Sequence, residues 1–312
     1  MKKRIHQINI FRKFPIKSQQ NVFEYLIDKG KFTSFGLEHD FKNILTYSQF
    51  CNKVPLRTYE ELYPFIERIR RGEKNVLWPG RVSFYAKSSG TTNDKSKFIP
   101  ISYESLKNCH YKGGKDMLSL YSNNFPDSKI YNGKGLMLGG SLSKNPKYTD
   151  GDLSAILIDN FPFWVNIHRV PKLEVALMLD WEKKLELMCK EALNSDVTNI
   201  TGVSSWMLVL FQRMIDESGA NNISEIWPNL ELFMHGGVKF NPYKRQFEQL
   251  IANDINYVEA YNASEGFFAI QDQKNSSDLL LMLDYGIFYE FLPLSDYLNG
   301  DDECVSLKDV TV

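Results

Sequence analysis

Apolar positions in the first eighty residues recur at steps of three and four along the chain. The stretches 22–27 and 59–66 show this spacing most clearly, and it predicts amphipathic helices. Thr58 stands immediately before the second stretch and is a suitable helix N-cap. Trp78-Pro79-Gly80 then ends the helical pattern. We therefore expect residues 1–80 to form a helical N-terminal segment that packs on the main domain.

Beyond residue 80, stretches with strand character alternate with stretches of helical spacing. The segment 81–86 alternates apolar and polar residues like a strand, and 134–140 and 154–158 are short apolar runs. A helix is expected over 173–192, with charged residues such as Lys184 on its other faces. Further helices are expected at 206–215 and 242–252, and further strands at 197–200, 230–234, 255–260, 267–270, 279–283 and 287–292. The alternation predicts an α/β fold over residues 81–312, with some antiparallel strands toward the end.

The composition narrows the range of partners. The 37 basic residues nearly balance the 38 acidic ones, for a net charge of −1, so we expect no nucleic-acid partner. No segment approaches the apolar length that a membrane span needs, and we expect no membrane partner either. The four cysteines are far apart, and the N-terminus lacks the apolar stretch of a signal peptide. These features favour a cytoplasmic location.

A loop of small and hydroxyl-bearing residues follows the strand expected at 81–86. It runs from Ser88 through Ser89, Gly90, Thr91 and Thr92 to Lys97 and Pro100. Small residues let the backbone approach an anion, and hydroxyls and lysines bind phosphate oxygens. No glycine is followed at once by Lys and then Ser or Thr in the spacing of a Walker A loop. The same residue types are common turn formers, so composition alone leaves a surface turn as the alternative.

Two later strands end in residues that suit a nucleotide. Gly236 and Gly237 follow the strand at 230–234, and a flat ring could lie against their exposed backbone. The segment Tyr261-Asn262-Ala263-Ser264-Glu265-Gly266 follows the strand at 255–260 and offers an aromatic face and a carboxylate that could ligate magnesium. Taken singly, Tyr261 is better explained as a packing aromatic and Glu265 as a solvated carboxylate. Together with the loop, they supply the parts of an ATP site.

These motifs resemble those of a known family. Ser88-Ser89-Gly90-Thr91-Thr92 with Lys97 and Pro100 resembles the phosphate loop of the adenylate-forming superfamily. Further stretches resemble the bacterial branch of the Gretchen Hagen auxin-responsive family, the acyl acid amido synthetases: Phe161–Trp164, Gly202–Met207, Ile226–Leu230 and His235–Tyr243. Tyr261–Gly266 resembles that family's second nucleotide motif, and the resemblance extends over nearly the whole chain. It implies the large N-terminal domain of the adenylate-forming fold, with mixed sheets flanked by helices.

The resemblance also implies a reaction in two steps that uses ATP and Mg²⁺. A carboxylic acid attacks the α-phosphate of ATP to give an acyl-adenylate and pyrophosphate, and an amino acid amine then displaces AMP. By motif position Lys97, Ser264 and Glu265 are the expected catalytic residues, with Glu265 also the magnesium ligand. The expected nucleotide-binding residues are Ser88, Ser89, Gly90, Thr91, Thr92, Gly236, Gly237, Tyr261 and Asn262. Val203 and Trp206 are candidates for the acyl pocket, where ordinary core packing of the Trp is the alternative.

Two departures from the family pattern leave alternatives open. Asn93 stands where the family loop has Gly, and one extra residue intervenes, so Lys95 competes with Lys97 as the phosphate lysine. The chain ends at Val312, and we expect the small C-terminal domain, with its ribose-binding aspartate and catalytic lysine, to be missing. The expected function is that of an acyl acid amido synthetase, present as an N-terminal fragment. The alternatives are adenylation with a thiol acceptor and a non-catalytic nucleotide- or acyl-binding module.

Overall fold

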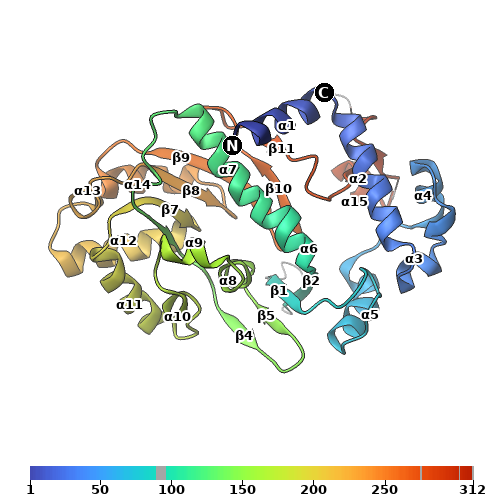
Figure 1. Ribbon diagram of the computed structural model, residues 1–312, viewed down its shortest axis with the longest axis horizontal. Coiled ribbons are helices and arrows are strands. Elements are labelled where there is room, and N and C mark those ends of the chain that lie inside the picture. Colours follow the sequence, from blue (N-terminus) through green and yellow to red (C-terminus); the bar gives the residue numbers. More distant parts are fainter. Residues whose placement is uncertain (89–95, 275, 302, 311–312) are drawn as a thin grey trace.

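The computed structural model of the chain describes residues 1–88, 96–274, 276–301 and 303–310. Helices form the N-terminal part, and all but the first lie at one end of the molecule, beside the C-terminal segment (Figure 1). Their bounds are α1 (Lys2–Lys13), α2 (Pro15–Gly30), α3 (Ser34–Glu38), η1 (Phe41–Asn43), α4 (Tyr47–Lys53) and α5 (Tyr59–Arg70). Thr58 caps α5 as expected, because its side chain accepts the Glu61 N–H while Glu61 reaches back to the Thr58 backbone.

A seven-stranded sheet forms the centre of the main domain. Its order is β11 (Leu280–Leu281), β10 (Gly266–Ile270), β9 (Asn256–Ala263), β8 (Leu232–Gly236), β7 (Val197–Gly202), β3 (Lys134–Met137) and β6 (Arg169–Val170). The strands from β9 to β6 pair in parallel, whereas β10 and β11 pair antiparallel. The expected α/β alternation with antiparallel strands toward the end is therefore confirmed.

A smaller sheet carries the serine- and threonine-rich loop. Its order is β2 (Lys97–Ile101), β1 (Phe84–Ser88), β5 (Thr149–Gly151) and β4 (Leu142–Lys144), and β1 and β2 form an antiparallel pair. Two further strands, β12 (Glu290–Phe291) and β13 (Val305–Ser306), pair near the end of the chain. The apolar run at 154–158 forms a helix, α8 (Leu153–Asp159). In sequence it lies between β5 of the smaller sheet and β6 of the seven-stranded sheet.

Helices cover both faces of the seven-stranded sheet (Figure 1). One face packs on α1 and on α7 (Tyr111–Asn124), which follows α6 (Tyr103–Ser105) and the π-helical turn η2 (Leu106–His110). The other face packs on α11 (Trp181–Leu193), α12 (Ser204–Ser218) and α14 (Asn241–Ile251). The remaining helices are short: α9 (Phe163–Ile167), α10 (Leu173–Ala176), α13 (Ile223–Ile226) and α15 (Leu294–Asn299). The helix expected over 173–192 is thus divided, with a break between α10 and α11.

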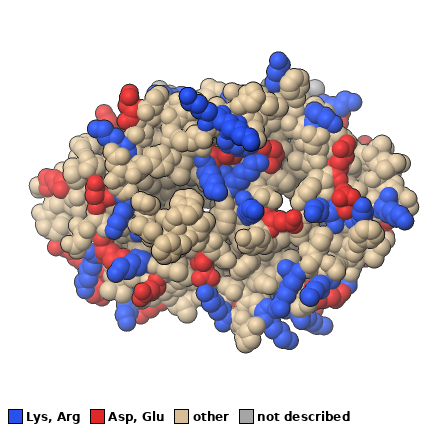
Figure 2. All heavy atoms as spheres, in the orientation of Figure 1, with Lys and Arg blue, Asp and Glu red and all other residues tan. Residues whose placement is uncertain are grey.

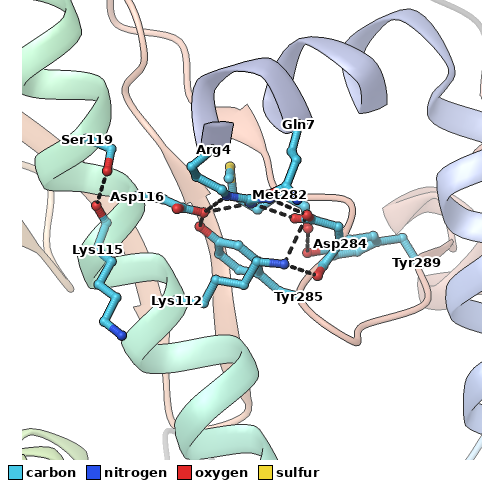
Figure 3. A network of polar contacts seen from close by, with 10 residues as sticks. All are labelled: Arg4, Gln7, Lys112, Lys115, Asp116, Ser119, Met282, Asp284, Tyr285 and Tyr289. Atoms are coloured by element: carbon cyan, nitrogen blue, oxygen red, sulfur yellow. Dashed lines mark hydrogen bonds and ion pairs between the residues drawn. The ribbon is translucent and has the colours of Figure 1, made fainter. Parts of the chain in front are cut away.

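A network of charged side chains joins the N-terminal helix to distant parts of the chain (Figure 3). Arg4 of α1 contacts Asp116 of α7 at 2.7 Å and Asp284, which lies between β11 and β12, at 2.5 Å. Lys112 of α7 also contacts Asp284, at 2.9 Å, and the buried Tyr285 hydroxyl donates to Asp116 at 2.7 Å. The network therefore holds α1 on the same face of the sheet as α7. The boundary that we expect at residues 80/81 stays a prediction.

Candidate functional site

The carboxyl ends of β3, β7, β8 and β9 lie along one edge of the seven-stranded sheet, because these strands are parallel. The register pairs Gly202 with His235 and Gly236 with Ala260, so the ends of three neighbouring strands lie side by side. Ligands in open α/β sheets bind outside such carboxyl ends. Several residues that the sequence analysis selected, from Gly236 to Glu265, come together at this edge.

Gly236 and Gly237 have different structural roles at the end of β8. A Cβ on Gly236 would lie 2.2 Å from the carbonyl oxygen of Ala260, so only glycine lets β8 and β9 approach this closely. Gly237 has a φ of +82°, and among the described residues a Cβ there would meet only Val203, at 3.9 Å. The backbone at Gly237 thus presents an open face beside Val203, which is the space that a flat ring requires.

The second motif forms the end of the β9–β10 hairpin. Tyr261 is 55% exposed, and its ring lies 4.9 Å from the ring of Phe268 at a tilt of 45°. Ala263 pairs with Gly266, which leaves Ser264 and Glu265 as the two residues of the turn. Glu265 is exposed. The hairpin therefore presents an aromatic face and a carboxylate on the same edge as Gly237.

Asn262 is fixed by a residue that the sequence analysis did not select. The Nδ1 of His110, from η2, lies 2.9 Å from Oδ1 of Asn262. His110 is only 3% exposed, and burial lowers the pKa of its imidazole, although the bond to Asn262 acts the other way. No spacing motif marks His110 in the sequence, because its partner lies far along the chain.

The loop that is expected to bind phosphate is described only at its two ends. Ser88 and Lys97 are register partners at the ends of β1 and β2. Ser89, Gly90, Thr91, Thr92 and Lys95 lie outside the described residues. The ammonium of Lys97 lies 3.9 Å from a Glu60 carboxylate oxygen and 5.1 Å from the centre of the Tyr59 ring. In this arrangement Lys97 contacts α5, and the choice between Lys95 and Lys97 stays open.

The two acyl-pocket candidates lie in different surroundings. Val203 precedes α12 and borders Gly237, so it belongs to the edge described above. Trp206 is 47% exposed and packs edge-to-face on Trp181 of α11, with ring centres 4.3 Å apart. Trp206 is accordingly part of the α11–α12 surface, and its role in an acyl pocket stays a prediction.

Three buried polar atoms at the same edge have no hydrogen-bond partner among the described residues. They are Oγ1 of Thr201, Oγ of Ser204 and Nδ1 of His235. Thr201 and His235 lie near the ends of β7 and β8, and Ser204 is the first residue of α12 and fully buried. Buried polar groups normally have a partner, so these atoms are free to bond a water or a ligand at this edge. The stretches Gly202–Met207 and His235–Tyr243 contain Ser204 and His235, and Thr201 immediately precedes the first of them.

A buried lysine supports the neighbouring loop. Lys184 was expected on a polar face of its helix, but it is 2% exposed, and its ammonium donates to the carbonyl oxygens of Gly139 and Gly140 at 2.6 and 2.7 Å. These glycines follow β3, where the Leu138 N–H donates to the Thr201 carbonyl at 3.1 Å. Burial lowers the pKa of Lys184 to about 8. Lys184 thus fixes a loop that borders the edge of the sheet.

A magnesium ion fits this edge only if the nucleotide supplies most of its ligands. The described residues contain no group of three or more His, Cys, Asp or Glu side chains that could hold a metal ion. Glu265 is exposed and makes no ion pair with any other described residue. Mg²⁺ is commonly held by one or two carboxylates together with phosphate oxygens and waters. One exposed carboxylate, with phosphate oxygens and waters as the other ligands, is compatible with that chemistry.

Comparison with known proteins identifies the family. The family described as the GH3 family N-terminal domain matches residues 4–255. The chain belongs to the GH3 family. Jasmonoyl–L-amino acid synthetase JAR4 of Nicotiana attenuata is 26% identical to this GH3 chain over 104 residues, which are 33% of the chain and 18% of that protein. Indole-3-acetic acid-amido synthetase GH3.5 of Arabidopsis thaliana is 29% identical over 89 residues, 28% of the chain and 14% of that protein.

Solved structures confirm the fold class. GH3.15 acyl acid amido synthetase superposes with a TM-score of 0.75 at 15% identity, covering 95% of this GH3 chain and 60% of that protein. A 2-hydroxyisobutyryl-CoA ligase in complex with 2-HIB-AMP and CoA superposes with a TM-score of 0.54 at 10% identity, covering 86% of this chain and 58% of that protein. The fold is that of the large N-terminal part of adenylate-forming enzymes, and the chain spans about three fifths of the synthetase.

Proposed function

We propose that this chain forms the nucleotide- and acyl-binding part of an ATP-dependent acyl acid amido synthetase. The observation that carries the proposal is the arrangement at one edge of the sheet. The open backbone at Gly237, the exposed ring of Tyr261 and the exposed carboxylate of Glu265 lie on neighbouring strand ends. Family membership supports the chemistry, because the relatives named above are amido synthetases.

In the proposed first step, a carboxylate oxygen attacks the α-phosphorus of ATP and pyrophosphate leaves. Catalysis of such a transfer depends on positioning and on neutralising charge at phosphorus. The backbone at Gly236 and Gly237 and the ring of Tyr261 would hold the adenine, and Ser264 would lie near the α-phosphate. Residues 88–92 with Lys97 or Lys95 would hold the other phosphates. Mg²⁺, held in part by Glu265, would neutralise phosphate charge.

In the proposed second step, an amino acid amine attacks the acyl carbon, and AMP leaves to give an amide. The substrates are thus a small carboxylic acid, ATP and an amino acid.

None of the helices in the described part of the chain is long and apolar enough to cross a membrane. Figure 2 shows acidic and basic side chains interspersed on one face, with some basic side chains grouped near the middle of the view. The net charge of the chain, −1, supports small-molecule substrates. We also propose a cytoplasmic location.

The first test is the exchange of labelled pyrophosphate into ATP, with magnesium and a panel of carboxylic acids. Exchange that depends on one of the acids supports acyl-adenylate formation. ATP binding without any exchange would favour the non-catalytic binding module. Addition of amino acids or thiols to an exchanging mixture then separates an amide product from a thioester.

A matched pair of variants tests the site itself. Tyr261→Leu removes the exposed ring at the end of β9, and we expect about 5- to 100-fold weaker ATP binding, the loss of one stacking contact. Tyr131→Leu removes a tyrosine of nearly equal exposure, 56%, that lies before β3 at the opposite edge of the sheet. ATP affinity should not change in that control. Equal affinities in both variants would rule out this position for the adenine.

A further inference from the structure

A cleft of about 320 Å³ lies along β6, the last strand of the seven-stranded sheet. Residues from the start of β3, from β6 and from the end of α11 line it. Four of the lining residues are basic, Lys134, Arg169, Lys172 and Lys190, and one, Glu191, is acidic. Strands β7 and β3 lie between β6 and β8, so this cleft is separate from the strand ends at which we place the nucleotide.

Arg169 carries a buried charge that has no counter-ion. It is only 4% exposed, and its guanidinium makes no ion pair with any described residue. Buried arginines are almost always paired, because an unpaired charge is costly away from water. Burial accordingly lowers the pKa of Arg169, and the charge of Glu191 offsets this effect only in part. An anion bound in the cleft would supply the missing counter-ion.

The guanidinium also has hydrogens left to donate. Nη1 donates to the Pro171 carbonyl at 2.7 Å, and Nε and Nη2 both donate to Oδ1 of Asn166, at 3.3 and 3.0 Å. A guanidinium has five N–H hydrogens, so these three bonds leave two without an acceptor among the described residues. Both acceptors are neutral groups. They fix the position of the guanidinium without neutralising its charge.

Two of the lysines at the cleft are unpaired as well. Lys134 and Lys172 are exposed, and neither forms an ion pair within the described part of the chain. Lys190 differs, because it contacts Glu186 at 2.5 Å. The carboxylate of Glu191 accepts the backbone N–H of Lys172 at 2.8 Å. The cleft therefore combines three cations that lack a carboxylate partner with a single carboxylate.

These three cations suit a phosphate group better than a carboxylate. A phosphate monoester carries about two negative charges near pH 7 and has three acceptor oxygens, whereas a carboxylate carries one charge. Arginine can bind such a group through two parallel N–H bonds, and lysine adds a point charge. The chain as a whole has a net charge of −1, so the cleft is a local concentration of positive charge.

We propose that the cleft along β6 binds the phosphate group of a small anion, with Arg169 as the buried anchor and Lys134 and Lys172 at the rim. The site is distinct from the nucleotide site, and it does not depend on the proposed function. Its ligand chemistry is a phosphate dianion. Inorganic phosphate and the phosphate group of a phosphorylated small molecule both have this chemistry.

Isothermal titration of the full chain tests the proposal, with inorganic phosphate in one arm and glycerol 3-phosphate in the other. Nucleotide and magnesium are left out, and potassium chloride keeps the ionic strength constant, because salt screens charges at an open cleft. We expect at least one of the two compounds to bind, and the tighter one identifies the source of the phosphate. If neither binds, the cations only offset the partial negative charge at the end of α11, and the proposal is wrong.

A matched pair of double variants locates the bound anion. Lys134→Gln combined with Lys172→Gln should weaken phosphate binding at least about 10-fold. Lys129→Gln combined with Lys147→Gln removes the same charge from two exposed lysines outside the cleft, and phosphate affinity should not change. Equal losses in both double variants, or no loss in either, would show that phosphate responds to overall charge or binds elsewhere. Either result would overturn the proposal.

Glu191→Gln should have the opposite effect. It keeps an acceptor for the Lys172 N–H and removes the negative charge from the lining, so we expect phosphate to bind about 2- to 5-fold more tightly. A structural defect would not produce this gain. An unchanged or lower affinity would contradict an anion beside Arg169. Arg169→Met should abolish binding, and if that variant fails to fold, the lysine and glutamate variants still decide the question.

Discussion

Arg4 and Asp284 stand 280 residues apart in the chain and form a two-pronged ion pair. Arg4 Nη1 donates to Asp284 Oδ2 at 2.5 Å, and Nη2 donates to Oδ1 at 2.9 Å (Figure 3). The Arg4 side chain is only 14% exposed, so its charge has little access to water. This pair holds α1 against the segment between β11 and β12.

Replacing Asp284 by Asn should destabilise the fold, because it leaves part of the Arg4 charge without a partner. We expect the free energy of unfolding in urea to fall by about 1 to 3 kcal/mol. Asp28→Asn is the control, since Asp28 and Lys31 form an ion pair on the exposed surface of the N-terminal helices. Its unfolding midpoint should not move. An unchanged midpoint for Asp284→Asn would show that the Arg4–Asp284 pair contributes nothing to stability.

His235 should make the protein sensitive to acid. Burial beside Phe240 lowers the pKa of His235 from 6.5 to about 4. Between these values the unfolded chain binds more protons, so the free energy of unfolding falls as the pH falls from 6.5 to 4. His235→Phe lacks this contribution. The unfolding free energy of the unmodified protein should therefore fall relative to that of His235→Phe as the pH falls from 6.5 to 4. Parallel curves from pH 7 to pH 4 would contradict the buried, neutral ring.

Lys184 should make the stability of the fold depend on pH in the alkaline range. Its folded-state pKa of about 8 lies below the ordinary 10.5, because burial disfavours the ammonium. The unfolded chain binds more protons between these values, so stability rises with pH from 8 to 10.5. Lys184→Met keeps the aliphatic length and removes the titrating group. The unfolding free energy of the unmodified protein should rise relative to this variant across the window, and a constant difference would be evidence against a buried amine.

The two glycines at the end of β8 should respond differently to alanine. Gly236→Ala places a methyl group 2.2 Å from the Ala260 carbonyl oxygen, and we expect a loss of about 1 to 3 kcal/mol in unfolding free energy. Gly237→Ala has room for the methyl group but must keep a φ of +82°, at a cost of about 1 to 2 kcal/mol. The methyl group would also cover the backbone that faces the proposed nucleotide, so ATP affinity should fall.

Gly72→Ala is the matched control for Gly237→Ala. Gly72 also has a positive φ, +100°, and open space around it, but it follows α5 in the N-terminal part of the chain. Its stability loss should be similar, while its ATP affinity should be unchanged. If both variants lose ATP affinity equally, the effect of Gly237→Ala comes from stability and not from the site.

Local features of the sequence were sufficient for most of the secondary structure and for the family. Helix α5 and its Thr58 cap, and the strands β7, β8 and β9, follow from spacing and capping, which act between residues close together in the chain. The motif residues Gly236, Tyr261 and Glu265 were recognisable because each occurs in a short run. Periodicity could not assign the apolar run at 154–158, since a short buried helix and a buried strand have the same pattern.

Contacts between distant parts of the chain were decided by the tertiary structure alone. His110 and Asn262 meet across 152 residues, and Lys184 reaches the carbonyl groups of Gly139 and Gly140 across 45 and 44 residues. The sequence placed Lys184 on a polar helix face, because lysines are usually solvated. Its burial depends on how α11 packs over the loop after β3, which no local pattern encodes. The motifs thus determined the kind of chemistry, and the packing of the sheet determined which side chains support it.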